Sequence, residues 1–292
     1  MHLSPLDVLR PVGRSAVCCW LALAAPAFAP APAAAGTAPQ RVVSTNLCTD
    51  QMAMLMAAPG QLKSVSFLAT EEGTSAMADE AARYPLNHGQ AEEIFLLQPD
   101  LVLAGTYTAQ ATVGLLRDLG FRVEQFAPAS SFEEVRNDLL RMGALLHREQ
   151  RAAELVAELD AGLADLAAHK PPARNVAIYY ANSYTSGSGT LADAIVRAAG
   201  LTNLGDTLGF HGMTRLPLEL LIAANPDIIL EGDNQYGAPA LARQNFSHPA
   251  FTALTGKAVA IPDKYTICGA PFTLEASRML QRAASGAQDK NR

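Results

Sequence analysis

Histidines and cysteines are few in this chain of 292 residues, basic residues do not outnumber acidic ones, and no motif of a known catalytic centre stands out. The six histidines are dispersed and lack the close spacing of ligands for a bare zinc or manganese ion. A net charge of -6 argues against a nucleic-acid partner. Because a phosphate-binding loop and a nucleophile elbow are both missing, we expect neither an enzyme nor a bound cofactor.

The N-terminus has the pattern of an export signal. Arg10 and Arg14 precede an uncharged run over residues 15–35, in which Ala33 and Ala35 offer small side chains for cleavage. The apolar part of this run is too short for a good membrane span, and prolines follow it closely. We therefore predict a signal peptide at residues 1–35 and a mature chain in the periplasm.

An internal repeat indicates two related lobes. The segment EEIFLLQPDLVL at residues 92–103 returns in altered form as ELLIAANPDIIL at residues 219–230. In each copy a glutamate is followed seven positions later by Pro-Asp and three aliphatic residues, which is typical of a short helix, a turn and a buried parallel strand. A weaker repeat places Asp50 and Asp193 at the start of apolar helical stretches, each after a β-rich run. Each lobe is thus predicted to begin with a strand, a helix cap and a helix.

The middle of the chain is predicted to be helical. Residues 131–170 contain almost no glycine or proline, and apolar residues recur there at helical spacing. His147 and Arg148 mark a candidate break between a shorter helix and a longer one. A long helix in this place would join the lobes as a stiff strut. The predicted organisation is a first α/β lobe at 36–130, an interlobe helix at 131–170 and a second α/β lobe at 171–292.

Side chains that follow the predicted strands are the candidates for ligand contact, because α/β lobes hold ligands at the carboxyl ends of their strands and two lobes form a cleft. In the first lobe these are Asn46, Cys48, Thr49, Asp50, Gln51, Phe67, Thr106 and Tyr107. In the second lobe they are Tyr184, Thr185, Asn234, Gln235, Tyr236, Tyr265 and Cys268. The tyrosines favour a large ring-containing ligand, with half-buried packing as the alternative for any single tyrosine.

Only Cys48 and Cys268 remain once the signal is removed. Both lie in predicted cleft-facing loops of a protein from an oxidising compartment, so a disulfide between them is the favoured interpretation. Two separate thiols and a reactive pair that touches the ligand remain the alternatives.

Two loops with polar residues could also reach the cleft. Residues 186–190, with the sequence SGSGT, could offer backbone N–H groups to an anion, although a plain loop with a helix N-cap is the favoured reading. His88 and His211 could reach the same region, and solvated loop histidines are the favoured interpretation of both.

The order of these features resembles a known family. A signal sequence, a first strand that ends in a polar loop, a Glu-x-Ile-x-x-Leu-x-Pro-Asp segment, a helical strut and a second lobe that repeats the scheme are similar to the helical-backbone class of periplasmic substrate-binding proteins. Within that class the chain looks most like the branch that serves ABC importers of cobalamin and ferric siderophores. The resemblance covers residues 41–284 and depends on the order of short motifs.

This resemblance implies a fold and a function. The fold would be α/β, with two Rossmann-like lobes around central parallel sheets, a long backbone helix between them and a ligand cleft between the lobes. The protein would be a monomer that captures a metal chelate and delivers it to an ABC permease and its ATPase. In that branch an acidic residue on each lobe docks onto the permease, which points here to Glu92 and Glu219, with Glu93 as a competitor. An ordinary solvated first-turn glutamate is the alternative for both.

Two other functions stay open from the sequence. A carrier of free zinc or manganese would need three or more His, Asp or Glu side chains that meet in the cleft. A secreted α/β enzyme would need a nucleophile with its base, or a paired acid and base.

Overall fold

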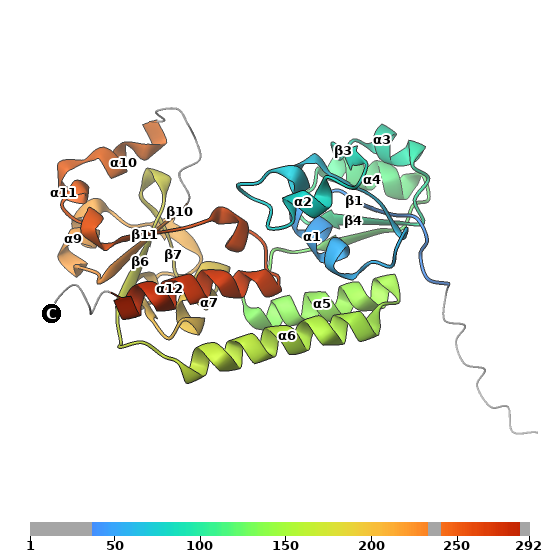
Figure 1. The fold of residues 1–292 in the computed structure, drawn as a ribbon. Helices are drawn as coiled ribbons and strands as arrows, with labels where there is room; N and C mark the ends of the chain where they lie inside the picture. Colours follow the sequence, from blue (N-terminus) through green and yellow to red (C-terminus); the bar gives the residue numbers. More distant parts are fainter. Residues whose placement is uncertain (1–36, 233–240, 287–292) are drawn as a thin grey trace, which may run out of the picture. The chain divides into compact units, whose positions relative to one another are not determined.

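The computed structural model describes residues 37–232 and 241–286 and shows a mixed α/β fold built on two parallel sheets (Figure 1). The predicted signal peptide at residues 1–35 lies outside the described residues, as do Asn234, Gln235 and Tyr236. In the part of the chain that is described, no helix has both the length and the apolar character needed to cross a membrane.

The first lobe contains a five-stranded sheet in the order β3-β2-β1-β4-β5, in which every pair of neighbours is parallel. Its strands are β1 (Val42–Ser44), β2 (Leu62–Ser66), β3 (Leu86–Asn87), β4 (Leu101–Gly105) and β5 (Val123–Phe126). Its helices are α1 (Leu47–Met56), η1 (Phe67–Thr70), α2 (Ala78–Ala81), α3 (Ala91–Leu96) and α4 (Gln110–Asp118).

Both faces of this sheet are covered. Alternate residues of a strand point to opposite faces, so Leu101 and Leu103 of β4 join the core that includes α1, whereas Val102 and Ala104 join a separate cluster with residues of α3 and α4. Strands buried on both faces read as continuous aliphatic runs. The Pro-Asp segments of the sequence have this composition for that reason.

The second lobe repeats the scheme with a four-stranded parallel sheet in the order β11-β10-β6-β8. Its strands are β6 (Asn175–Tyr179), β8 (Thr202–Asn203), β10 (Ile228–Gly232) and β11 (Ala258–Ile261), and β7 (Tyr184–Ser186) pairs antiparallel with β9 (Met213–Arg215). The α-helices are α7 (Leu191–Ala198), α8 (Leu204–Thr207), α9 (Leu218–Ala224), α10 (Gln244–Ser247), α11 (Pro249–Thr252) and α12 (Leu274–Gly286). Short 3-10 helices are η2 (Ala181–Ser183), η3 (Leu241–Arg243), η4 (Thr255–Lys257), η5 (Asp263–Tyr265) and η6 (Pro271–Thr273).

The predicted interlobe helix is two helices. α5 (Phe132–Leu146) ends at His147, which adopts the left-handed conformation with φ 55°, and α6 (Glu149–Ala168) runs back along it (Figure 1). The N–H of Arg148 donates to the carbonyl of Gly143 at 2.7 Å and closes the end of α5. The break expected at His147 and Arg148 is confirmed, and the strut expected over residues 131–170 is corrected to a helical hairpin.

The caps of α1 and α7 precede the aspartates at the starts of these helices. Asn46 caps α1 by accepting from the N–H of Cys48, and Thr190 caps α7 by accepting from the N–H of Asp193. Asp50 and Asp193 lie inside the first turn and are buried. A cap residue needs an extended backbone just before the first turn, which Asn46 and Thr190 have and the aspartates do not.

One apolar core cluster connects the lobes through the helical hairpin. It contains Val42 of β1, Leu139 of α5, Leu159 of α6, Ile178 of β6 and Leu280 of α12. Because this cluster is continuous, the two sheets and the hairpin stabilise one another through shared buried surface.

Gly143 permits the close approach of α5 and α6. A Cβ atom at Gly143 would lie 2.4 Å from the Cβ of Ala152, whereas a Cβ at Gly114 in α4 would meet nothing within 4 Å. We expect Gly143→Ala to destabilise the protein by about 1–3 kcal/mol, because the helices must separate. Gly114→Ala, the matched control, should stabilise it by up to about 1 kcal/mol through helix propensity. Urea unfolding of both variants tests this, and equal effects would contradict the packing role of Gly143.

Candidate functional site

The carboxyl ends of the first sheet form one polar and aromatic edge. Because all five strands are parallel, the loops that follow them emerge on the same side of the sheet. Taken in sheet order from β3 to β5, the residues that follow the strands are His88, Phe67, Asn46 with Cys48, Thr106 with Tyr107, and Ala127 with Pro128. This edge is the candidate site.

A pocket of about 60 Å³ lies at this edge. It is lined by Asn46, Cys48, Met52, Gly105, Thr106, Tyr107, Phe126, Ala127, Pro128, Ala129, Asp138, Ile267 and Gly269. Sites that enclose a drug-sized ligand have volumes of about 300–1,000 Å³. A large ligand would therefore rest over this pocket and on the surrounding edge, where the Tyr107 side chain is 87% exposed.

Five of the predicted contact residues belong to this edge, and one of them, Asn46, lines the pocket. Cys48, Thr106 and Tyr107 line the pocket, and Phe67, which is 39% exposed, follows the neighbouring strand β2. They come from three strand ends far apart in the sequence.

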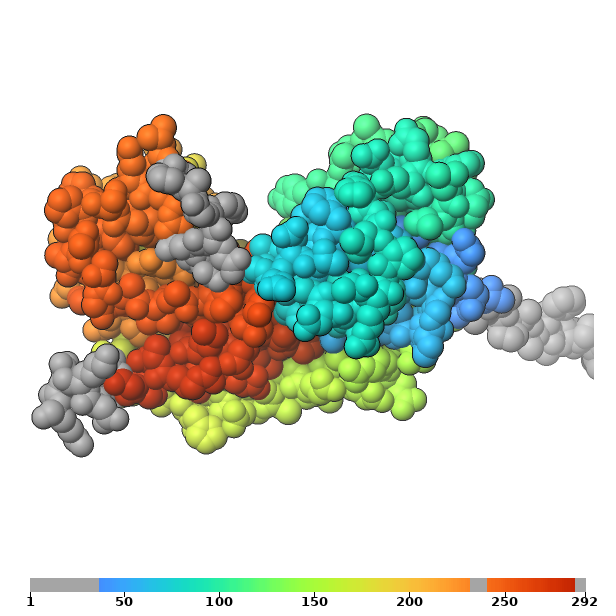
Figure 2. Space-filling model, turned by 45° about the horizontal axis from the view of Figure 1, so that its top comes forward, coloured from blue at the N-terminus to red at the C-terminus, as the bar shows by residue number. Residues whose placement is uncertain are grey.

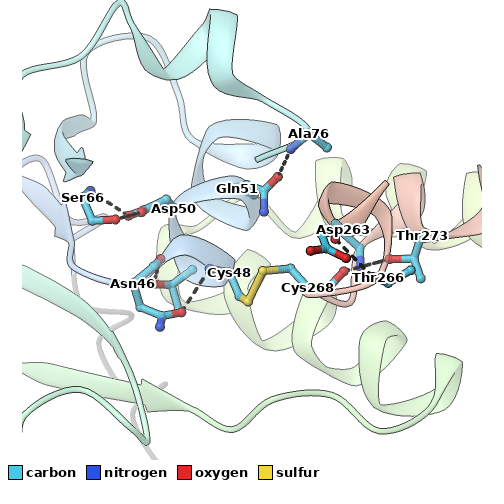
Figure 3. The surroundings of a disulfide bond; sticks show 12 residues. Asn46, Cys48, Asp50, Gln51, Ser66, Ala76, Asp263, Thr266, Cys268 and Thr273 are labelled. Atoms are coloured by element: carbon cyan, nitrogen blue, oxygen red, sulfur yellow. Dashed lines mark hydrogen bonds between the residues drawn. A yellow bond between two sulfur atoms is a disulfide. The ribbon is translucent and has the colours of Figure 1, made fainter. Parts of the chain in front are cut away.

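Three predicted contact residues of α1 do not line the pocket, because their side chains are fully buried inside the lobe. The Thr49 hydroxyl bonds to that of Ser44 at 2.8 Å. Asp50 accepts from the N–H and hydroxyl of Ser66, and Gln51 accepts from the N–H of Ala76 at 2.8 Å (Figure 3). Residues four apart share a helix face. Only Cys48 and Met52 of α1 therefore face the pocket.

A disulfide joins Cys48 at the start of α1 to Cys268, which follows η5 (Figure 3). The Cα atoms lie 5.1 Å apart and the sequence separation is 220 residues. Cys268 is buried and its carbonyl accepts from the Thr273 hydroxyl at 2.8 Å. Neither sulfur is a thiol in this structure, and Cys48 contributes its half of the bridge to the pocket wall.

The segment after β11 contacts the first lobe at a second point. The N–H of Lys264 donates to the carbonyl of Gly73 at 3.1 Å, and Figure 2 shows the corresponding surfaces in contact. Tyr265 of this segment is half-buried, packs against the shared core and has the Lys264 ammonium 5.5 Å from its ring centre. The disulfide and this hydrogen bond together hold residues 264–268 beside the edge of the first sheet.

The remaining second-lobe candidates divide between surface and interior. Thr185 of β7 is fully buried, so it is not available to a ligand. Tyr184 is half-buried, and the guanidinium of Arg215 on the paired strand lies 5.6 Å from its ring centre. Tyr184 with Arg215 is thus an accessible pair in the second lobe.

The SGSGT loop at residues 186–190 does not present free donors at its centre. The N–H groups of Gly187 and Ser188 donate to the carbonyls of Gly212 at 2.8 Å and Phe210 at 3.0 Å. Thr190 caps α7. The loop therefore serves as a helix cap and as a partner of residues 210–212.

Comparison with known proteins gives the family. The sequence profile described as periplasmic binding protein matches residues 42–259. The chain belongs to the periplasmic binding protein family.

A cobalamin-binding protein of Halobacterium salinarum is 28% identical over 199 residues, which is 66% of this chain and 54% of that protein. This periplasmic binding protein thus spans about half the length of the curated relatives it matches.

Solved structures show the same two-lobed fold. A periplasmic heme-binding protein from Roseiflexus sp. RS-1 superimposes with a TM-score of 0.70 at 22% identity, covering 85% of this chain and 98% of that one. The periplasmic vitamin B12 binding protein of Vibrio cholerae gives 0.63 at 17% identity, covering 86% and 98%. At these sequence identities the similarity establishes the fold of this chain and does not establish which ligand it binds.

Sequence reasoning missed part of the pocket of this binding protein. Asp138 projects from α5 and lines the pocket, and burial raises the pKa of its carboxyl to about 6 against the opposing effect of Arg141. Phe126 and Pro128, at the end of β5, were missed as well. Phe126 and Pro128 could have been found by including residues at the end of β5 among the candidates that follow strands. Asp138 lies in the middle of a helix, where no sequence pattern marks it as a pocket residue.

Metal-binding groups are dispersed in the described residues. Over 37–232 and 241–286, no three His, Cys, Asp or Glu side chains gather as a site for an ion.

Buried Asp50 makes stability depend on pH. Burial raises the pKa of Asp50 from 3.8 to about 7, while hydrogen bonds from Ser44 and Ser66 oppose the rise. Because the folded state favours the protonated form, the contribution of Asp50 to stability is greatest below about pH 4 and is lost as pH rises through 7, by about 4 kcal/mol at most. Asp50→Asn retains an acceptor for Ser66 and has no charge to bury.

The advantage of Asp50→Asn over the unchanged protein should therefore grow between pH 4 and pH 8. Chemical unfolding at both pH values measures it. Asp118→Asn, an exposed position on α4, is the control and should show no such trend. A constant difference across this range would refute the role of Asp50.

Proposed function

We propose that this chain is the solute-binding component of an ABC importer, which captures a metal chelate in the periplasm and delivers it to a membrane permease. Membership of the periplasmic binding protein family supports the binding role. The cobalamin-binding, heme-binding and vitamin B12-binding proteins to which the chain is similar support the chelate class. No chemical step is assigned to the protein.

The observation that carries the proposal is the composition of the first-sheet edge. Phe67 and Tyr107 present ring faces, and Asn46 and Thr106 supply an amide and a hydroxyl between them. Ring faces with a few polar groups suit the organic shell of a chelate. A bare divalent ion instead needs several charged or imidazole donors at bonding distance.

The second lobe contributes side chains of the same kind. Tyr184 and Tyr265 are half-buried rings, and Arg215 is an exposed cation over Tyr184. A guanidinium stacked on a ring can pair with a carboxylate of a ligand. We place Tyr184, Arg215 and Tyr265 on the second-lobe side of the site.

The chelate assignment predicts selective binding. The protein should bind at least one of ferric protoporphyrin IX, cobalamin and a ferric hydroxamate with a Kd of about 1 μM or tighter, on the order of -8 kcal/mol. Zinc and manganese should give no comparable heat in isothermal titration. Tyr107→Ala should weaken chelate binding, while Leu96→Ala, which changes another highly exposed residue, on α3, should not. Tight binding of a bare ion without a response to any chelate would overturn the proposal.

Docking on the permease is proposed for Glu92 and Glu219. Each is exposed in the first turn of the helix that precedes a Pro-Asp strand, α3 in one lobe and α9 in the other. Glu93 is engaged elsewhere, because its two carboxylate oxygens accept from the N–H and the ring of His88. The hydrogen bond from the backbone N–H of His88 is the main reason that the pKa of Glu93 lies below its ordinary value, and the bond from the His88 ring adds to this effect.

The surface beside Glu92 fits an interface. A groove of about 370 Å³ between α3 and α4 is lined by Ala91, Glu92, Phe95, Leu96, Leu115 and Leu119. Four of these side chains, Phe95, Leu96, Leu115 and Leu119, are large, apolar and exposed. Exposed apolar area rimmed by a charge is typical of a surface that binds another protein.

Docking and ligand binding should separate in a double variant. Glu92→Ala with Glu219→Ala should leave chelate affinity almost unchanged, because exposed charges away from a pocket contribute little to it. Transport by the cognate permease should fall, most clearly at low salt where charges are least screened. Glu133→Ala with Glu149→Ala removes first-turn glutamates from α5 and α6 and is the matched control. Normal transport by the first double variant would show that the docking assignment is wrong.

A further inference from the structure

His88 occupies a distinctive place on the candidate site. It follows β3 directly, at the end of the edge that also presents Phe67, Asn46 and Thr106. Its side chain is 59% exposed. Since neighbouring strands are about 4.8 Å apart, β3 and β4 are separated by about 14 Å along the edge, comparable with the width of a tetrapyrrole ring.

The imidazole of His88 is oriented by a carboxylate. Its Nδ1 lies 3.0 Å from Oε1 of Glu93, and its backbone N–H donates to Oε2 of the same group at 2.7 Å. A carboxylate can only accept, so Nδ1 carries the proton and the lone pair of the neutral ring is on Nε2. No described residue makes a hydrogen bond to Nε2. Histidines that bind metals nearly always have this arrangement, with the other ring nitrogen bonded to a carboxylate or carbonyl.

The Phe67 ring packs against one face of the His88 imidazole. The centres of the Phe67 and His88 rings are 5.2 Å apart and their planes differ by 26°. Hydrogen bonds on one edge and a ring on one face leave His88 little freedom to turn. Such positioning exceeds what a solvated loop histidine requires, since exposed side chains usually keep their rotational freedom.

A single oriented imidazole selects one kind of cargo. Glu93 is bonded to the other ring nitrogen, and no group of three His, Cys, Asp or Glu side chains forms among the described residues, so His88 lacks the set of donors that a bare ion needs. A metal already bound by a planar macrocycle needs only one further donor, because the ring fills the equatorial positions and leaves the axial ones open. A hexadentate siderophore fills all six positions of its iron and leaves none for a protein atom.

We infer that His88 is an axial ligand of the cargo metal through Nε2, that Glu93 positions it, and that the cargo is therefore a metal tetrapyrrole with an open axial position. This inference rests on the proposed function and narrows its ligand class.

The test compares a metal-loaded and a metal-free macrocycle. The mature protein is titrated with ferric protoporphyrin IX and with metal-free protoporphyrin IX, and absorbance spectra are recorded. His88→Ala should lower the affinity for the ferric ring by about tenfold or more and abolish the spectrum of imidazole ligation. The affinity for the metal-free ring should change less than about twofold, because stacking and polar contacts are retained.

Matched variants separate ligation from structure. His169, at the end of α6, is another exposed histidine, and its Nδ1 lies 3.2 Å from the carboxylate of Asp165. His169→Ala should change neither titration. Glu93→Gln should keep ligation but weaken affinity for the ferric ring by about tenfold and shift its absorbance bands. Imidazole added to His88→Gly should restore the ligation spectrum.

Three results would count against the inference. Unchanged affinity and spectrum in His88→Ala would overturn it, as would an equal loss of affinity for both rings. Tight binding of a hexadentate ferric hydroxamate with no binding of the ferric ring would overturn it while leaving the proposed function in place. Failure to bind any chelate would refute the proposed function itself, and would be recognised because the unchanged protein would fail together with the variants.

Discussion

The common direction of the strands in each sheet is the constraint on which the rest of the structure depends. Parallel neighbours cannot be joined by tight turns, so each connection must cross a face of the sheet, usually as a helix. Helices on both faces bury the central strands and require the aliphatic residues of β4 and β10. The same direction brings all carboxyl ends to one edge. The candidate site exists because Asn46, Phe67, His88 and Tyr107 follow different strands of one such sheet.

A second constraint is the connection between the lobes. The core cluster that runs from β1 through α5 and α6 to β6 and α12 links the two sheets through buried side chains. The disulfide from Cys48 to Cys268 and the hydrogen bond from Lys264 to Gly73 add two ties outside that core. Both ties end in the segment after β11, so this segment of the second lobe helps to form the pocket of the first. Ile267 and Gly269 are pocket residues for this reason.

Local signals in the sequence predicted the elements better than the site. The Pro-Asp repeats identified β4 and β10 and the helices before them, because proline and aliphatic runs act within a few residues. The sequence placed Asp50 and Asp193 at the starts of helices, whereas the caps are Asn46 and Thr190, because only the backbone shows where a helix begins. The break expected at His147 and Arg148 is present, but the sequence did not show that the left-handed His147 reverses the chain there.

The sequence alone determined the α/β class, the duplication, the chain positions of most strands and the family, because these depend on composition and on patterns a few residues long. It also indicated that loops after the strands form the site. Tertiary structure decided which side chains of those loops face outward. Asp50 and Gln51 turn into the lobe while Cys48 faces the pocket, because successive side chains of a helix point in directions about 100° apart. Tertiary structure also decided that Asp138 reaches the pocket and that Glu93 orients His88. These contacts depend on how α5 and α3 pack against the sheet, and this packing is a property of the whole fold.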